Sequence, residues 1–274
     1  MSGILYVTGT PIGNLGDLSP RAAQTLEEAD FIAAEDTRVT LKLLNHLGIK
    51  KPMVSYFEHN KRERGEVICA RIEQGESCAI VTDAGMPCIS DPGEDLIRLC
   101  EERGIKTVVV PGPSAVIAAL AVSGLETGRF CFEGFLSVNK KSRSEHLQSL
   151  QNERRTMIFY EAPHKLPATL RDLFAAFGDR KLSIVRELTK IHEEVIRTTT
   201  AIAAEKYADG SVKGEIVLVL EGKRGEEAAE SCTLEYAVDL AKRLIADGQK
   251  TTEAAKNAAA MTGFKKNDIY RELI

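Results

Sequence analysis

The sequence predicts two successive α/β domains followed by a small helical extension. Three observations support this prediction. Short apolar runs alternate with helical patterns through residues 1–123, longer and more closely spaced runs follow through 124–222, and residues 232–274 are helical in pattern. The charged, apolar-poor segment 223–231 is typical of a linker. A chain of 274 residues, 43% of them hydrophobic, is long enough to bury two such cores.

Five strands are predicted in the first domain. Each is a nearly continuous apolar run, and helical patterns separate consecutive runs. Strands of this kind form a parallel sheet that helices cover on both faces. Their expected ranges are 4–7, 31–34, 53–57, 78–81 and 107–110.

A mixed sheet is predicted in the second domain. The last strands follow one another with little chain between them, as antiparallel neighbours do, whereas helices at 144–151 and 164–177 lie among the first three. The expected strands are 130–135, 156–160, 182–186, 194–198 and 216–220.

The extension is predicted to contain three helices, at 234–246, 253–261 and 268–273. Gly263 separates the last two, and short helices joined through a glycine turn are typical of a helix-turn-helix. Basic and acidic residues nearly balance in this extension, so its charge gives only a weak indication of nucleic-acid binding. A small helical bundle packed on the body remains the alternative.

Composition and charge narrow the class of protein. The formal net charge of −4 argues against a protein that binds nucleic acid over most of its surface, but it allows a local basic face. The longest apolar run, 116–122, is too short to span a membrane, and no cleavable signal is apparent before the first strand. Six scattered cysteines without a C-x-x-C pair indicate reduced thiols, and no ligands cluster for a metal. We therefore expect a cytoplasmic protein without a metal site.

Three loops that follow predicted strands are unusually rich in glycine and proline: 10–17, 83–91 and 111–114. The carboxyl ends of strands in an open α/β sheet are where ligands bind. Glycines allow close approach to the backbone, and Asp83 can accept hydrogen bonds from hydroxyls or attract a cation. After this loop we predict a helix with Asp91 as its N-cap and Pro92 as its first residue.

A dinucleotide site is one alternative for these loops. Gly9, Gly13 and Gly16 are spaced G-x3-G-x2-G, which differs from the G-x-G-x-x-G of dinucleotide binders. Glu35 nevertheless follows about twenty residues later, where such proteins hold a ribose. Pro11 lacks the backbone N–H that a pyrophosphate cradle would use.

Several segments together resemble the tetrapyrrole methylase superfamily, and within it the branch that 2′-O-methylates a cytidine in 16S ribosomal RNA. The resemblance covers about residues 3–222, and the helical tail also fits that branch. Two departures are Met86, where the pattern usually has Thr, and residues 137–139, which lack the usual proline. The matching segments are TGTPIGNLGD at 8–17, EDTR at 35–38, DAGMPCISDPG at 83–93, PGPSA at 111–115, YEAPH at 160–164 and RELTK at 186–190.

The resemblance implies a homodimer that binds S-adenosylmethionine in the cleft between its two α/β domains. A sulfonium methyl donor is already activated and needs no metal. Carried over position by position, the cofactor contacts fall on Pro11, Asp83, Gly85, Met86, Ser114, Ala115, Tyr160 and Ala162.

The acceptor must lie in line with the methyl group, and a ribose hydroxyl benefits from a general base or a polarising network. Asp36 and Arg38 are the first candidates, because they leave a strand end that faces the same cleft, and Glu187 is a further one. An ordinary helix cap with a local salt link is the competing interpretation of Asp36 and Arg38.

RNA binding requires cationic contacts to phosphates. Lys140, Lys141 and Arg143 form the best basic loop. The resemblance implies 16S ribosomal RNA, in the assembled 30S subunit, as the partner. Two alternatives remain open. One keeps the methyl donor and changes the acceptor to a tetrapyrrole or another small molecule. The other is a non-catalytic nucleotide- or RNA-binding module.

Overall fold

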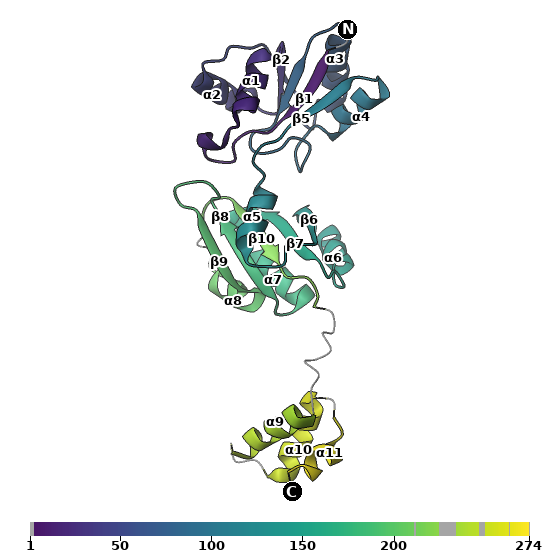
Figure 1. The fold of residues 1–274 in the computed structure, drawn as a ribbon, viewed down its shortest axis with the longest axis vertical. Helices are drawn as coiled ribbons and strands as arrows, with labels where there is room; N and C mark the ends of the chain where they lie inside the picture. The colour runs from purple at the N-terminus through teal and green to yellow at the C-terminus, as the bar shows by residue number, and fades with distance from the viewer. Residues whose placement is uncertain (1–2, 211, 225–233, 247–249, 263, 274) are drawn as a thin grey trace. The chain divides into compact units, whose positions relative to one another are not determined.

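The computed structural model describes residues 3–210, 212–224, 234–246, 250–262 and 264–273. The chain divides into two compact units, residues 1–223 and 224–274 (Figure 1). The predicted linker from residue 225 onward and the turn at Gly263 lie outside the described residues. No helix of the described part is long and apolar enough to cross a membrane.

The first sheet is parallel throughout, as predicted, and its strand order is β3-β2-β4-β1-β5. Val7 of β1 pairs with Ile80 of β4 on one side and with Val109 of β5 on the other. The three loops rich in glycine and proline therefore follow three adjacent strands. The strands are β1 (Ile4–Thr8), β2 (Phe31–Ala34), β3 (Met53–Ser55), β4 (Cys78–Val81) and β5 (Lys106–Val110).

Helices cover both faces of this sheet (Figure 1). Successive residues of a strand point to opposite faces. Accordingly, Phe31 packs with Ile68 and Leu96 on one face, whereas Ile32 packs with Leu26 and Leu44 on the other. The helices are α1 (Pro20–Glu28), α2 (Thr37–Leu47), α3 (Lys61–Glu73) and α4 (Glu94–Glu102).

The start of α4 corrects the predicted cap. The helix begins at Glu94 with Gly93 as its N-cap, and Asp91 and Pro92 lie in the preceding loop. Cys88 and Ser90 have positive φ values of 71° and 66°, so the chain turns through left-handed residues before Gly93, at φ 142°, leads into the helix. Such conformations are costly for residues with a Cβ and concentrate at functional sites.

The second sheet is mixed, as predicted, with strand order β6-β7-β10-β8-β9. The pair β6 and β7 is parallel, and the other neighbours are antiparallel. The strands are β6 (Phe130–Phe135), β7 (Thr156–Glu161), β8 (Lys181–Arg186), β9 (Glu194–Thr199) and β10 (Ile216–Leu220).

Helix α5 (Ala115–Ser123) follows the first sheet in the chain but packs on the second. Its residues Val116 and Leu120 share a buried cluster with Ile158 and Val185. The other face of this sheet is covered by α7 (Leu166–Phe177) together with α6 (Lys140–Ser149) and α8 (Thr200–Lys206), the last of which was not predicted. A short 3-10 turn, η2 (Pro163–Lys165), precedes α7.

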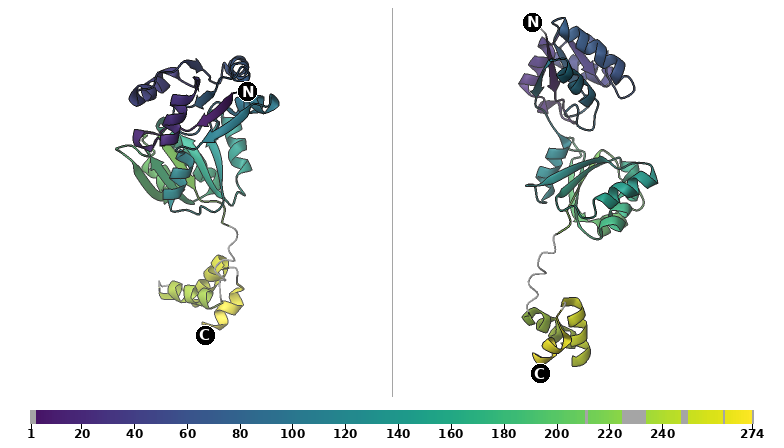
Figure 2. Two further views of the ribbon diagram at one scale, coloured as in Figure 1. Left: turned by 45° about the horizontal axis from the view of Figure 1, so that its top comes forward. Right: turned by 90° about the vertical axis from the view of Figure 1, so that its right-hand side faces the viewer.

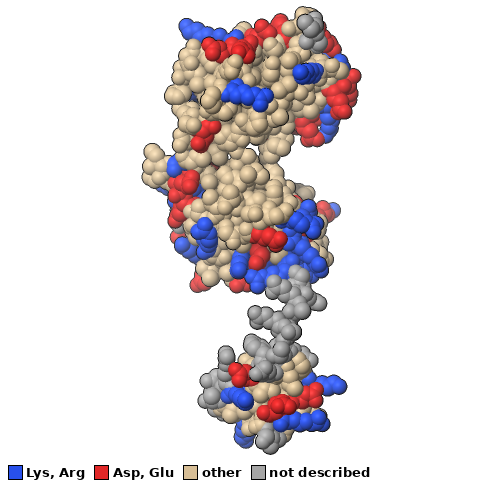
Figure 3. All heavy atoms as spheres, in the orientation of Figure 1, with Lys and Arg blue, Asp and Glu red and all other residues tan. Residues whose placement is uncertain are grey.

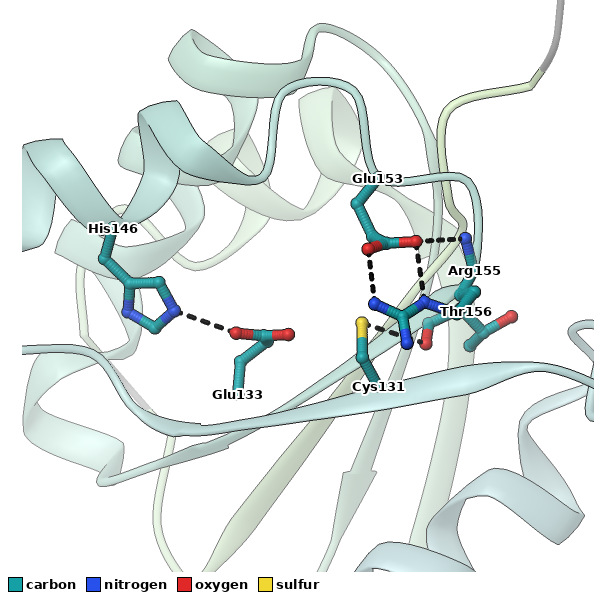
Figure 4. A network of polar contacts seen from close by, with 6 residues as sticks. All are labelled: Cys131, Glu133, His146, Glu153, Arg155 and Thr156. Atoms are coloured by element: carbon teal, nitrogen blue, oxygen red, sulfur yellow. Dashed lines mark hydrogen bonds and ion pairs between the residues drawn. The ribbon is translucent and has the colours of Figure 1, made fainter.

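Helix α6 begins four residues earlier than predicted. Asn139 caps it, because its Oδ1 accepts hydrogen bonds from the backbone N–H groups of Lys141 (3.0 Å) and Ser142 (3.2 Å). His146 then joins the helix to β6 through a 2.9 Å contact between its Nε2 and Glu133 Oε2 (Figure 4). The predicted basic loop is therefore the first turn of a helix.

The second unit contains three helices, α9 (Leu234–Ala246), α10 (Thr251–Thr262) and α11 (Lys266–Arg271), close to the predicted ranges. They pack around a small core of their own (Figure 2). Ala237 and Ala241 of α9 contact Ala255 and Ala258 of α10 and Ile269 of α11 within this core. Small side chains at these positions let the helix backbones approach closely.

Candidate active site at the strand ends

The three strand-exit loops are tied together by backbone hydrogen bonds. The N–H of Thr10 donates to the carbonyl of Gly85 (2.9 Å), and the N–H of Gly85 donates back to Thr10 (3.2 Å). The N–H of Gly9 donates to the carbonyl of Val110 (3.0 Å) on the other side. The loop that holds Pro11 thus lies between the loop of Asp83 and the loop of Ser114.

Gly9 has no room for a side chain. A Cβ built on it would lie 2.7 Å from the Cα of Gly112 and 2.7 Å from the sulfur of Met86. The β1 and β5 loops therefore pass each other backbone against backbone, and Met86 closes the gap from the third loop. The sequence predicted a cofactor contact at Met86, and the structure places its side chain against Gly9.

Carboxylates gather at the ends of β2 and β4. Thr82 Oγ1 donates to Glu35 Oε2 (2.5 Å), and the backbone N–H of Asp36 donates to Asp83 Oδ1 (3.2 Å). Burial raises the pKa of Asp83, and the neighbouring Glu35 charge raises it further. Burial, together with Glu35, also raises the pKa of Asp91 to about 6. A cationic ligand beside these groups would relieve their mutual repulsion.

Asp36 and Arg38 form the helix cap and local salt link that competed with their catalytic interpretation. Asp36 Oδ1 accepts from the backbone N–H of Arg38 (2.8 Å), and the two side chains form an ion pair of 2.6 Å. The Arg38 hydrogen bonds lower the pKa of Asp36 to about 2, which makes this carboxylate a weak base in the unliganded protein. Arg38 remains 87% exposed and open to a further anion.

Glu187 is locked in a network of the second sheet. It has a φ of 51°, and its Oε1 accepts from the backbone N–H of Glu215 (2.9 Å) and from Lys190 Nζ (3.0 Å). These two partners lower the pKa of Glu187. Lys190 in turn lies against the first loop, since a Cβ on Gly13 would come within 2.6 Å of its Cγ. Sequence reasoning did not single out Lys190, although it belongs to the segment 186–190.

Tyr160 lies near the carboxyl end of β7 and packs against the cluster that contains Val116 of α5. Its ring packs edge-on against Phe132 and Phe135, with centroid distances of 4.8 and 5.4 Å. Burial and the charge of Asp91 raise its pKa to about 12, while a backbone hydrogen bond with Val116 opposes the shift. Tyr160 is thereby close both to the Asp91 loop and to the start of α5, where Ser114 and Ala115 lie.

Ala162 is fixed by the residue before it. Its backbone N–H donates to Glu161 Oε1 (2.8 Å), and the other carboxylate oxygen of Glu161 accepts from Thr169 Oγ1. Glu161 is only 4% exposed. A buried carboxylate whose oxygens are both hydrogen-bonded holds the backbone after β7 in one conformation.

The predicted RNA-binding residues face different surroundings. Lys140 and Lys141 are exposed in the first turn of α6. Arg143 turns inward, where its Nε lies 2.5 Å from Asp172 Oδ2. Nearby, Arg155 is bound bidentately to Glu153 (Figure 4). Among the described residues, no group of three or more His, Cys, Asp or Glu side chains is placed to hold a metal ion.

Comparison with known proteins places these features in a family context. The model of the family described as Tetrapyrrole (Corrin/Porphyrin) Methylases matches residues 4–204. A Synechocystis protein named "Ribosomal RNA small subunit methyltransferase I" is 46% identical over 270 residues, 98% of this chain and 96% of its own length. A Thermotoga maritima protein of the same name is 47% identical over 221 residues, 81% of this chain and 99% of its own.

The fold is also found among solved structures. Uroporphyrin-III C-methyltransferase from Thermus thermophilus, crystallised as a complex with S-adenosyl homocysteine, superposes with a TM-score of 0.58. The match covers 80% of this chain and 97% of that one, at 17% sequence identity. At this identity the likeness concerns the arrangement of the two sheets and their helices.

Proposed function

The chain belongs to the tetrapyrrole methylase family, and from that premise we propose that it transfers a methyl group from S-adenosylmethionine to the 2′-hydroxyl of a cytidine in 16S ribosomal RNA. The main support is the 46% identity, over nearly the whole chain, to a relative named as a small-subunit ribosomal RNA methyltransferase. The three joined strand-exit loops supply a site of the kind that this reaction needs.

The cofactor would be held by the first-sheet loops and closed in by the segment after β7. The residues in contact with it would be Pro11, Asp83, Gly85, Met86, Ser114, Ala115, Tyr160 and Ala162. When bound, the donor supplies an activated, positively charged methylsulfonium group. Burial and the charges of neighbouring carboxylates raise the pKa values of Asp83 and Asp91. A cation placed beside them would favour their ionised forms and would itself be held in place.

On the acceptor side, we assign Asp36, Arg38 and Glu187 to orienting the RNA nucleotide and the loops around it. The exposed Arg38 guanidinium can bind a phosphate or a sugar oxygen while Asp36 fixes its direction. Glu187 holds Lys190, whose stem packs on Gly13 and thereby positions the loop of Pro11. Exclusion of water and alignment of the hydroxyl with the methyl group would then account for much of the rate.

We further propose that the protein acts as a homodimer in the cytoplasm and modifies the RNA within an assembled 30S subunit. Family resemblance supports these points. The identity to relatives named as ribosomal RNA methyltransferases favours RNA over a tetrapyrrole as the acceptor. The exposed cations at the start of α6 would contact its phosphates.

Transfer of a labelled methyl group tests the proposal. The wild-type protein is incubated with labelled S-adenosylmethionine and, separately, with 30S subunits, naked 16S RNA and a precorrin. We expect label only in the RNA, with mass spectrometry placing the methyl on a cytidine ribose. Methylation of the precorrin, or of a nucleobase instead of the ribose, would overturn the proposal.

A further inference from the structure

A groove of about 860 Å³ lies between α6 and α7, on the face of the second sheet away from α5. Its cationic lining consists of Lys140 and Arg143 from α6, Lys165 from η2 and Arg171 from α7. Among the residues that the structure describes, Asp172 is the only carboxylate in the lining. Figure 3 shows Lys and Arg side chains gathered on the flank of this part of the molecule where α6 lies. The groove is therefore strongly positive in a chain whose net charge is negative.

Three of the four cations are free to meet a ligand. Within the described residues, Lys140, Lys165 and Arg171 form no ion pair, whereas cations elsewhere in the first unit, such as Lys61 and Arg103, contact two carboxylates each. Unpaired cations that share a groove repel one another. An anionic ligand would relieve this repulsion.

The floor of the groove is already fixed. Arg143 Nε contacts Asp172 Oδ2 at 2.5 Å, and Arg143 Nη2 donates to Thr169 Oγ1 at 2.8 Å. Thr169 in turn binds the buried Glu161, which holds the backbone N–H of Ala162. One chain of hydrogen bonds thus connects the groove to a residue assigned to the cofactor site.

The lining also indicates which part of a nucleic acid would fit. Of the described residues that line the groove, none is a Phe, Tyr or Trp on which bases could stack. Base stacking is usual in grooves that hold single strands through their bases. The lining does contain hydrogen-bonding side chains, including Ser144, Gln148 and Gln151, beside the cations. This combination suits phosphates and ribose hydroxyls more than base edges.

We propose that the α6–α7 groove binds the sugar–phosphate backbone of a single-stranded RNA segment next to the methylated nucleotide. The inference rests on the proposed function, because that function supplies the polyanion. The groove begins at His164 and Lys165, directly after the Tyr160 and Ala162 segment. An RNA strand bound in this groove would therefore lead toward the proposed cofactor site. Binding there would be largely independent of base sequence.

Charge reversal in the full-length chain tests the proposal. The variant Lys165→Glu with Arg171→Glu is compared with Lys50→Glu with Lys106→Glu, two exposed lysines near the amino ends of first-sheet strands, away from the strand-exit loops. The probe is a fluorescent single-stranded RNA of about twelve nucleotides, within the range of known single-strand sites. Affinity is measured by anisotropy over a series of salt concentrations.

We expect the groove variant to bind the RNA at least about tenfold more weakly at low salt. Because each phosphate contact with a single strand contributes about 0.7 to the slope of log affinity against log salt, the slope should fall by about 1.4. The Lys50 and Lys106 control should retain affinity and slope, and the charge-conserving variant Lys165→Arg with Arg171→Lys should retain most of the binding.

Two further measurements separate the possible outcomes. Calorimetry with S-adenosylmethionine should give the same Kd for all variants. If the wild type does not bind the cofactor, the proposed function fails. If cofactor binding is intact but groove and control variants bind RNA alike, the groove proposal alone is overturned. Polyglutamate that competes as well as RNA at equal charge would show an acidic polypeptide site instead.

Discussion

Asp83 Oδ1 accepts a hydrogen bond of 3.2 Å from the backbone N–H of Asp36. These residues follow β4 and β2, so the bond ties the loop of the proposed cofactor site to the start of α2. The residues directly before them form a second link, in which Thr82 Oγ1 donates to Glu35 Oε2 at 2.5 Å. The two loops therefore form one wall of the proposed cofactor site. Because an asparagine side chain can accept the same hydrogen bond, the charge of Asp83 can be removed without changing the shape of the side chain.

Asp83→Asn should weaken S-adenosylmethionine binding about tenfold, or about 1.4 kcal/mol, while the protein remains at least as stable as the wild type at pH 7. Asparagine keeps an oxygen for the Asp36 N–H but removes the charge proposed to face the sulfonium. Burial raises the pKa of Asp83, which means that the folded state favours the neutral form of this side chain. An uncharged asparagine should therefore not destabilise the protein. Calorimetry measures the Kd, with Glu102→Gln on the surface of α4 as control. An unchanged Kd would remove Asp83 from the site.

Gly9→Ala should destabilise the protein by about 1–3 kcal/mol and weaken cofactor binding, because its methyl group would collide with Gly112 and Met86. Gly128→Ala is the matched control, since a Cβ there meets nothing within 4 Å. Urea unfolding gives the stability of both variants, and calorimetry gives their cofactor affinity. Equal effects at the two positions would contradict the close passage of the β1 and β5 loops.

The sequence was sufficient to locate the strands, because each buried strand is a short apolar run and its period differs from that of the helices. The motif-bearing loops were also correctly placed after strands. The order β3-β2-β4-β1-β5, which puts three of these loops side by side, depends on pairing between distant segments and could only be assumed. The mixed character of the second sheet followed from the short spacing of its last strands, which are antiparallel neighbours in the structure.

Local errors had identifiable causes. Asp91 and Pro92 match a helix-start pattern, yet α4 begins at Glu94, with Gly93 at φ 142° as its N-cap. Residues 140–143 appeared as a basic loop, whereas the Asn139 side chain starts a helix there. The partner of Arg143 is Asp172, 29 residues away in sequence, and no local pattern indicates that contact. Tertiary contacts of this kind decide which cations are free.

Asp91→Asn should stabilise the unliganded protein at pH 7 by about 1–2 kcal/mol and have little effect at pH 4. The pKa of Asp91 is raised from 3.8 to about 6, so the folded state binds a proton more readily than the unfolded state. The stability contributed by the protonated Asp91 is therefore lost as the pH rises from 3.8 through about 6. The full pKa difference of Asp91 would correspond to about 3 kcal/mol of unfolding free energy, and the partial exposure of the side chain reduces this contribution.

The pH test compares free energies of unfolding in urea at pH 4 and pH 7 for the wild type and the Asn variant. Groups such as Asp36 and Glu153, whose pKa values are lowered to about 2, are present in both proteins and therefore cancel in the comparison. Parallel pH profiles for the two proteins would show that Asp91 is not the group that titrates.

Removal of residues 224–274 should leave S-adenosylmethionine affinity within about twofold of the full-length value. The Thermotoga maritima relative matches over 221 residues, 99% of its own length, which is close to the length of the first unit here. The helices of the second unit have a core of their own. Calorimetry on residues 1–223 measures the Kd, and loss of binding would mean that the extension supports the cofactor site.

Thr169→Val should cost about 1–3 kcal/mol of unfolding free energy, because it removes a hydroxyl that donates to the buried Glu161 and accepts from Arg143. Thr169→Ser keeps the hydroxyl and loses one methyl group, which costs about 1 kcal/mol. Since Glu161 also holds the Ala162 N–H, only the Val variant should bind S-adenosylmethionine more weakly. Urea unfolding and calorimetry on both variants give the two quantities. If Ser and Val lose equal stability and affinity, the hydrogen-bond chain from the groove to Ala162 does not support the site.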